Sequence, residues 1–284
     1  MGSRKKVVRP AAKRELTRSL GKEFSLSERR ACRITGAHRS TVRHQPKDRC
    51  DVDTLAKIRS IAVNNPRYGC PRVHTMLRRQ GIIINHKRTE RIYYENGLQL
   101  KKRPPKRKRR RPVSEVPRPC GPNRKWSLDF VHDNLADGRP IRILTVIDEY
   151  TRECVGMEVD TSLSSERLVA TMNKIGMGRP LPSNIGADQG PEFISNAFLR
   201  WAQSKGVTVS YCQPGNKNEN AFVESFNGRL RDECLNMHWF LSLREARAEV
   251  EEWRHHYNNH RPHSSLGGLT PSEFAASGKC ALVA

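Results

Sequence analysis

Residues 126–130 read Trp-Ser-Leu-Asp-Phe, and they place one acidic residue, Asp129, inside an apolar, strand-like run. An unpaired carboxylate is costly to bury, so an acid in such a run indicates a function. Two further acids, Asp188 and Glu224, follow downstream with 35 residues between them. Carboxylates are the hard oxygen ligands that suit Mg²⁺, and a pair of such ions can serve both the attacking and the leaving oxygen of a phosphoryl transfer. The three acids therefore predict a site with two bound Mg²⁺ ions.

A mixed α/β pattern surrounds these acids. Residues 126–134, 142–148 and 154–159 read as strands joined by short turns, which predicts an antiparallel meander. Further downstream we expect a helix at 166–175, a strand at 184–188, a helix at 196–205, a strand at 207–211 and a helix at 221–235. Asp129 and Asp188 would then lie on strands and Glu224 on a helix, so rigid elements would hold all three.

Two more helices are expected near the C-terminus. Leu243, Ala246, Val250, Trp253 and Tyr257 repeat at a spacing of three or four, which predicts a long amphipathic helix. The sequence Thr-Pro-Ser-Glu at 270–273 fits a capping box with proline at the first helical position. It predicts a short terminal helix.

The charge of the chain is divided unevenly. The whole chain has a formal net charge of +23, but residues 1–112 hold 33 Lys and Arg against 8 Asp and Glu, whereas residues 113–284 hold 19 against 21. The basic excess lies entirely outside the part that carries the three acids. This asymmetry predicts a nucleic-acid-binding arm joined to a catalytic body, with binding that weakens strongly as salt is raised.

Four regions are expected: a basic helical segment at 1–52, a helix-turn-helix-like DNA-binding domain at 53–100, a basic linker at 101–120, and a catalytic core with a helical tail at 121–284. Residues 1–20 are expected to be loose at their start. Residues 27–45 fit either a helix-turn-helix or a generic helical hairpin around Gly36. Asn85 and Gly97 bound the last helix of the second region. The alternative for that region is a helical packing module with a solvated basic surface.

Basic residues in three places are candidate DNA contacts. They are Arg72, Lys87 and Arg88 in the helical domain, Lys101, Lys102, Arg103, Lys106 and Arg107 in the linker, and Lys217 and Arg231 around the last acid. Arg231 lies seven residues after Glu224, on the same helical face as Asn220 and Asn227. The simpler interpretation of Arg231 is an ion pair with Asp232 or Glu233.

Four other acids are weighed and set aside as metal ligands: Asp133, Asp148, Glu192 and Glu219. Asp148 stands beside a turn and could pair with Arg152. Glu192 could lie near the metals without binding them, and Glu219 stands in a polar loop.

Several motifs together resemble a known family. They are Trp126-x-x-Asp129-Phe130, Asp188-Gln189-Gly190-Pro191-Glu192-Phe193, Asn220-Ala221-x-x-Glu224-Ser225-Phe226, the C-terminal stretch from Tyr257 to Pro271, and Tyr68-Gly69-x-x-Arg72 with Asn96-Gly97-Leu98 upstream. They are similar to the core of retroviral-type integrases, with its two Asp and one Glu, and more closely to the transposases of the IS-three family of insertion sequences. Residues 27–276 carry the resemblance.

The resemblance implies an α/β chain with an RNase H-like catalytic core, a five-stranded mixed sheet flanked by helices. It implies a DNA transposase that cleaves at the ends of an insertion sequence and joins the freed 3′-OH to target DNA. The implied catalytic and metal-binding residues are Asp129, Asp188 and Glu224, with two Mg²⁺ ions or Mn²⁺ in their place. The family's usual Asn after the second Asp is Gln189 here, so no role is carried over to that side chain.

The resemblance also implies DNA and further copies of the chain as partners. The coiled-coil heptads and upstream DNA-binding module of the family's fused product are not apparent. We therefore expect either the second-reading-frame product alone or a protein that borrows that module from a partner, with the first-reading-frame protein as the candidate. Two alternatives stay open: a catalytically silent DNA-binding regulator of transposition, and an RNase H-like nuclease without strand transfer. Neither a long apolar run nor a signal-peptide pattern appears, so we expect no membrane partner and a bacterial cytoplasmic protein that joins the nucleoid when bound to DNA.

Overall fold

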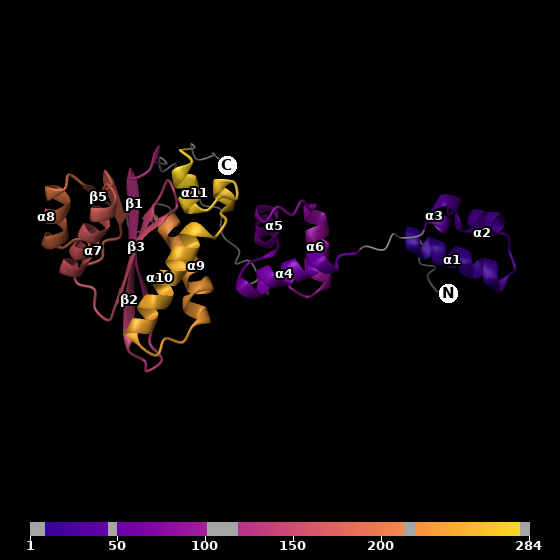
Figure 1. Ribbon diagram of the computed structural model, residues 1–284, viewed down its shortest axis with the longest axis horizontal. Coiled ribbons are helices and arrows are strands. Elements are labelled where there is room, and N and C mark those ends of the chain that lie inside the picture. The colour runs from indigo at the N-terminus through magenta and orange to yellow at the C-terminus, as the bar shows by residue number, and fades with distance from the viewer. Residues whose placement is uncertain (1–8, 45–49, 101–118, 213–219, 279–284) are drawn as a thin grey trace, which may run out of the picture. The chain divides into compact units, whose positions relative to one another are not determined.

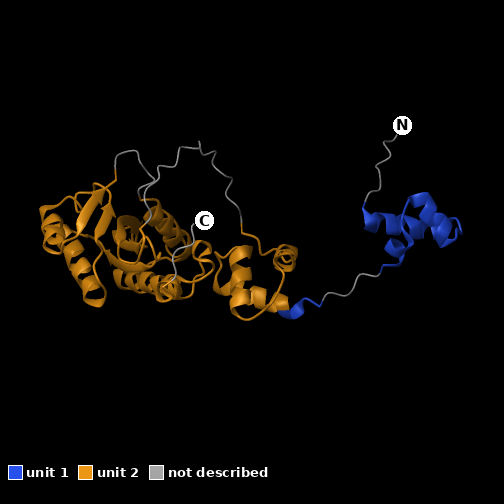
Figure 2. Ribbon diagram, turned by 90° about the horizontal axis from the view of Figure 1, so that it is seen from above, with its two compact units in different colours: residues 1–53 blue, residues 54–284 orange. Residues whose placement is uncertain are grey.

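A computed structural model describes residues 9–44, 50–100, 119–212 and 220–278 of the chain. The chain divides into two compact units, Met1–Asp53 and Thr54–Ala284, coloured blue and orange in Figure 2. Within the described residues, no helix combines the length and the apolar character needed to cross a bilayer. The expected linker at 101–120 falls almost wholly outside the described residues.

The first unit is built from three helices, α1 (Pro10–Glu23), α2 (Glu28–Thr35) and α3 (Arg39–Arg43). Gly36 ends α2 with a φ of 62°, a left-handed conformation that glycine adopts without strain, and α3 follows directly. The expected pair of helices around Gly36 is therefore confirmed. The expected loose start of the chain falls on residues 1–8, which lie outside the described residues. Proline at the first helical position begins α1, and Thr17 of α1 bonds Thr35 of α2 at 2.8 Å.

The second unit begins with three more helices, α4 (Val52–Asn64), α5 (Cys70–Arg79) and α6 (His86–Glu95). They enclose a small apolar core of their own: Ile58, Ile61, Tyr68, Val73, Leu77, Ile92 and Tyr93. The side chain of Asn85 caps α6 by accepting from the Lys87 amide, as expected. Gly97 follows that helix with a φ of 67°, which confirms the predicted end.

A five-stranded mixed sheet forms the centre of the remaining chain. Its strands are β1 (Lys125–Asn134), β2 (Pro140–Asp148), β3 (Cys154–Asp160), β4 (Asn184–Ala187) and β5 (Thr208–Tyr211). They lie in the order β3-β2-β1-β4-β5. β1 to β3 form the predicted antiparallel meander, while β4 and β5 are added in parallel to β1.

Helices cover both faces of this sheet (Figure 1). On one side lie α7 (Ser165–Gly178) and α8 (Asn196–Ser204), and on the other α9 (Ala221–Glu233) and α10 (Leu243–Asn259). α9 stops two residues before its predicted end and gives way to a 3₁₀ turn, η1 (Leu235–Met237). A second 3₁₀ turn, η2 (Ser264–Leu266), precedes α11 (Pro271–Ala276), whose predicted capping box between Thr270 and Glu273 is confirmed.

The alternation of side chains along β1 determines which residues reach the site. Trp126 and Leu128 belong to the apolar cluster under α7 and α8, whereas Val131 belongs to the cluster under α9 and α10. Ser127 and Asp129 share the parity of Val131, so they face the α9 side of the sheet. On that side Phe226 of α9 packs against Trp253 and Tyr257 of α10, with ring centroids 5.3 and 4.8 Å apart.

The contact between β3 and α7 depends on a glycine. A Cβ atom on Gly156 would overlap the Ile175 side chain and lie 2.9 Å from its Cγ1. Gly156→Ala should therefore lower the free energy of unfolding by about 1–3 kcal/mol, the usual cost of overpacking. Gly178→Ala is the matched control, because a Cβ there meets nothing within 4 Å. Chemical denaturation of Gly156→Ala with and without Ile175→Val tests the cause. The double variant should lose less free energy of unfolding than the sum of the losses in the two single variants. Additive costs would contradict this packing account.

Candidate functional site

Asp129 lies near the middle of β1, opposite Thr145 of β2. Its Oδ1 accepts a hydrogen bond from the Phe130 amide at 2.8 Å, and its Oδ2 accepts one from Asn227 Nδ2 at 2.7 Å. Thr145 Oγ1 lies 3.0 Å from Asn227 Oδ1, and Thr145 is fully buried. Both carboxylate oxygens of Asp129 are thus fixed in direction before any ligand binds.

Asp188 and Glu224 approach the same region from two other elements. Asp188 directly follows β4, is exposed, and accepts from the Gly190 amide at 3.1 Å. Glu224 is exposed in the first turn of α9. The pKa of Asp129 is raised, foremost by burial and then by the negative charges of Asp188 and Glu224. The structure therefore brings the three predicted acids within electrostatic reach of one another.

The three acids do not form a closed ligand set. In the parts of the chain that the structure describes, no three His, Cys, Asp or Glu side chains are gathered closely enough to hold a metal ion. Asp188 and Glu224 are exposed, and Asp129 is half-buried. Their oxygen donors and accumulated negative charge still fit a hard divalent cation.

Asn227 is the residue of this site that the sequence analysis left without a role. Its helical position, three residues after Glu224, gave a usable signal, because residues at that spacing share one face of a helix. Its partner could not be found from the sequence, since Asp129 lies 98 residues upstream.

A buried ion pair involves the same strand. Glu149, 2% exposed, lies 3.0 Å from Lys125 Nζ and accepts from Ser127 Oγ at 2.5 Å.

The acids that were set aside have other partners. Asp148 is fully buried and accepts from the amides of Asn123, Tyr150 and Thr151 at 2.7 to 3.0 Å, so it fixes a turn. Glu192 forms an ion pair with Arg142, whose hydrogen bond is the main reason that the pKa of Glu192 is lowered.

Asp133 and Glu219 complete that group. Asp133 accepts from the Asn134 amide at 2.9 Å on β1. Glu219 lies outside the described residues.

The candidate DNA contacts differ in their exposure and in their ion pairs within the chain. Lys87 and Arg88 are exposed on α6. Arg72 instead forms an ion pair with Glu233 at 3.1 Å. Lys101, Lys102, Arg103, Lys106, Arg107 and Lys217 lie outside the described residues.

Arg231 makes a contact that was predicted neither by its interpretation as a DNA contact nor by the ion pair with Asp232 or Glu233. Its Nη2 donates to the backbone oxygen of His132 on β1 at 3.1 Å. Glu233 forms ion pairs with Arg72 and Arg261, and Asp232 lies 3.9 Å from Arg67. Arg231 therefore links α9 to β1, and its contact with a DNA phosphate stays a prediction.

Models of known families match most of the chain. A model described as an integrase core domain matches residues 119–217, a second with that description matches residues 205–271, and a model of an HTH-like domain matches residues 51–108. The matches cover the sheet with its acids and the helices α4 to α6.

Similar proteins include products of insertion elements. The chain is 42% identical over 278 residues to the insertion element IS476 uncharacterized 39.2 kDa protein of Xanthomonas euvesicatoria, which covers 96% of this chain and 80% of that protein. It is 42% identical over 262 residues to the insertion element IS407 uncharacterized 31.7 kDa protein of Burkholderia multivorans, covering 91% and 94%. It is 29% identical over 249 residues to the transposase InsF for insertion sequence IS3A of Escherichia coli, covering 83% and 85%.

A solved structure shares the fold. The simian T-cell lymphotropic virus intasome in complex with the PP2A regulatory subunit B56 gamma contains a chain that matches with a TM-score of 0.52 and 15% identity, covering 81% of this chain and 76% of that one. Together with the integrase-core matches, this confirms the predicted fold: an RNase H-like five-stranded sheet preceded by an HTH-like helical domain.

The repulsion within the site has a measurable consequence. A raised pKa means that the folded protein binds the Asp129 proton more tightly than the unfolded chain does. Stability is then lost as the pH rises from the ordinary aspartate value, about 3.9, through the raised pKa. Asp188→Asn removes one of the charges responsible and keeps an oxygen for the Gly190 amide. In chelating buffer it should raise the melting temperature at about pH 7, and its advantage should shrink towards about pH 4.

Thermal melting across this pH range, with the parent protein as control, measures the effect. A lower melting temperature of Asp188→Asn at neutral pH, or an advantage that does not change with pH, would show that Asp188 does not act on Asp129.

Proposed function

Because the chain belongs to the IS-three family of insertion-sequence transposases, we propose that it binds the ends of its own insertion sequence, cleaves the DNA there and joins the freed 3′-OH to a target phosphodiester. One observation supports this chemistry above all. Asp129 is held by two hydrogen bonds on the central strand, and its pKa is raised in part by Asp188 and Glu224. Negative charge collected on three oxygen-bearing side chains suits a pair of divalent cations.

In this proposal Asp129, Asp188 and Glu224 hold two Mg²⁺ ions, with Mn²⁺ as a substitute. When bound, such ions increase the nucleophilicity of an attacking oxygen and stabilise charge on a leaving one. The acids serve as ligands in their ionised form. Asp129 is the one whose raised pKa must fall, and the arrival of positive charge lowers the pKa of a nearby carboxyl.

Asn227 is the positioning residue of the site. Its amide nitrogen holds Asp129 Oδ2 at 2.7 Å, and Thr145 Oγ1, 3.0 Å from the amide oxygen, fixes which way the amide points. The second carboxylate oxygen is held by the Phe130 amide. Asp129 thus loses little rotational freedom when a ligand binds, and such outer partners of metal ligands typically contribute about 10–100-fold to metal affinity or activity.

DNA is held by the basic parts of the chain in this proposal. Lys87 and Arg88 are exposed on the last helix of the part that matches an HTH-like domain, and we infer that this helix faces DNA. The basic residues of 101–112 add contacts to phosphates that are independent of sequence. An insertion sequence has two ends, so we propose that at least two copies act together, and the first-reading-frame protein is a candidate partner.

The three acids can be tested one at a time. Asp129→Asn, Asp188→Asn and Glu224→Gln should each lower cleavage and joining by more than about a hundredfold, beyond what loss of an outer partner costs. DNA binding should persist, because the acids do not contact phosphates directly. The assay uses the full chain, labelled DNA from the ends of its own element and Mg²⁺, with products resolved by strand.

Asp133→Asn is the matched control, because Asp133 lies on the same strand and the same side as Asp129. It should keep near-parental activity. Activity of any acid variant at the level of Asp133→Asn would remove that residue from the site. Cleavage without joining by the parent protein would favour a nuclease, and binding without either reaction would favour a silent regulator.

A further inference from the structure

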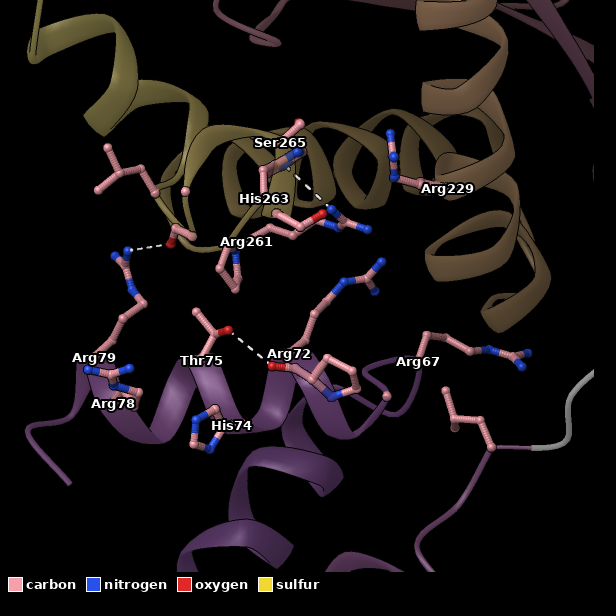
Figure 3. A pocket seen from close by; sticks show the side chains of 18 residues that line it. Arg67, Arg72, His74, Thr75, Arg78, Arg79, Arg229, Arg261, His263 and Ser265 are labelled. Carbon is pink, nitrogen blue, oxygen red and sulfur yellow. Dashed lines mark hydrogen bonds between the residues drawn. The ribbon is translucent and has the colours of Figure 1, made fainter. Parts of the chain in front are cut away.

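A cavity of about 990 Å³ lies between α5 and the segment 261–269 that follows α10 (Figure 3). Both walls belong to the second compact unit. The cavity is lined by six arginines: Arg67, Arg72, Arg78, Arg79, Arg229 and Arg261. Arginine side chains repel one another, so a wall of this kind is costly unless anions are present.

Acidic partners within the chain neutralise only part of this charge. Glu233 serves both Arg72 and Arg261, at 3.1 and 2.7 Å. Glu273 pairs with Arg79 at 2.5 Å, and Asp232 lies 3.9 Å from Arg67. Three carboxylates therefore face six guanidinium groups.

Arg78 and Arg229 are the two arginines left over. Within the described ranges of the chain, neither has a carboxylate partner within ion-pair distance. Arg78 lies on α5, and Arg229 lies on α9, which adds to the lining opposite α5.

The electrostatics of a neighbouring histidine agree with a positive cavity. The pKa of His263 is lowered to about 2, first by burial and then by Arg261, Arg229 and Arg72. Its ring stays neutral at any physiological pH. The lining also offers the exposed serines Ser264 and Ser265 as hydroxyl donors.

The two walls come close at one point. A Cβ atom on Gly268 would lie 3.3 Å from Thr75 Cγ2, and Gly268 has a φ of 85°, so glycine is favoured there on both grounds. Arg79 donates to the backbone oxygen of Gly268 at 3.4 Å, and its bidentate pair with Glu273 joins α5 to α11, just after this segment. These contacts form one side of the cavity.

We propose that this cavity binds the phosphodiester backbone of a DNA strand, and that it does so with both of its walls at once. Guanidinium forks match phosphate oxygens in pairs, and Arg78 and Arg229 have donors available for them. One wall lies in the part that matches an HTH-like domain and the other in the part that matches an integrase core. The inference rests on the proposed function, whose substrate it places.

The location gives the site a consequence for catalysis. Arg229 stands on α9 five residues after Glu224. A phosphate bound to Arg229 would therefore be fixed relative to the helix that carries the last acid of the site. Arg78 would fix the same strand relative to the HTH-like domain.

The test is a comparison of two double variants of the full chain that remove equal charge. Arg78→Gln/Arg229→Gln changes the cavity, and Arg200→Gln/Arg244→Gln changes two exposed arginines that do not line it. Binding to duplex DNA from the end of the element is measured in chelating buffer over a range of salt. The cavity variant should bind at least about tenfold more weakly, with the slope of log K against log salt reduced by about 2, whereas the control changes less than about threefold.

A second pair of variants separates a loss of DNA binding from a loss of folding. Ser265→Glu adds a negative charge at an exposed position of the lining and should weaken DNA binding, while Ser265→Gln should not. Equal losses for the cavity and control doubles, or no loss for either, would overturn the proposal. So would a cavity that serves a free anion only: inorganic phosphate would then stabilise the parent but not the cavity variant, and DNA affinity would not differ.

Binding in chelator is independent of cleavage and joining, so the two proposals fail separately. A parent protein that binds DNA through the cavity but never cuts or joins it would refute the proposed function alone. A parent that cuts and joins, with the cavity variant binding as tightly as the control, would refute this inference alone.

Discussion

Glu233, at the C-terminal end of α9, binds two arginines that come from distant parts of the chain. Arg261 donates to both of its carboxylate oxygens at 2.7 Å, and Arg72 donates to one of them at 3.1 Å. Arg261 is 2% exposed and the Glu233 side chain 9%. Removing one partner of such a buried pair typically costs about 3–5 kcal/mol, because the remaining charge stays buried alone. This cluster joins the end of α9 to α5 through Arg72 and to the segment after α10 through Arg261.

The same helix carries the residues that complete the site. Glu224 stands in its first turn, Asn227 one turn later holds Asp129, and Arg229 faces the arginine-lined cavity. Phe226 fastens the helix to α10 through Trp253 and Tyr257. A single rigid helix joins these groups. A shift in the contact between Arg72 of α5 and Glu233 would therefore also shift Glu224. In this account, α9 links DNA binding to the geometry of the acids.

Local sequence patterns were enough to predict most of the helices and strands, while the roles of the three acids stay a prediction. The strand around Asp129, the cap at Asn85 and the capping box at Thr270 each depend on neighbours within a few residues, and all three are as expected. Contacts between residues far apart in the sequence could not be predicted from such local patterns. Asn227 contacts Asp129 across 98 residues, and Arg72 contacts Glu233 across 161. The first contact gives Asn227 a place at the site, and the second adds an ion pair to Arg72, whose contact with DNA stays a prediction. Within the basic helical segment predicted at 1–52, the bounds of α1 were not predicted, because its first residues read as basic and proline-bearing rather than periodic.

The central claim is that Asp129, Asp188 and Glu224 act together as ligands of divalent cations. Crystals of the protein with DNA from the end of its element, grown with Mn²⁺ and measured at the manganese absorption edge, test it most directly. The account predicts anomalous density bounded by the carboxylates of these three residues, and its loss in Asp188→Asn. Manganese elsewhere on the protein, or density that persists without Asp188, would contradict it.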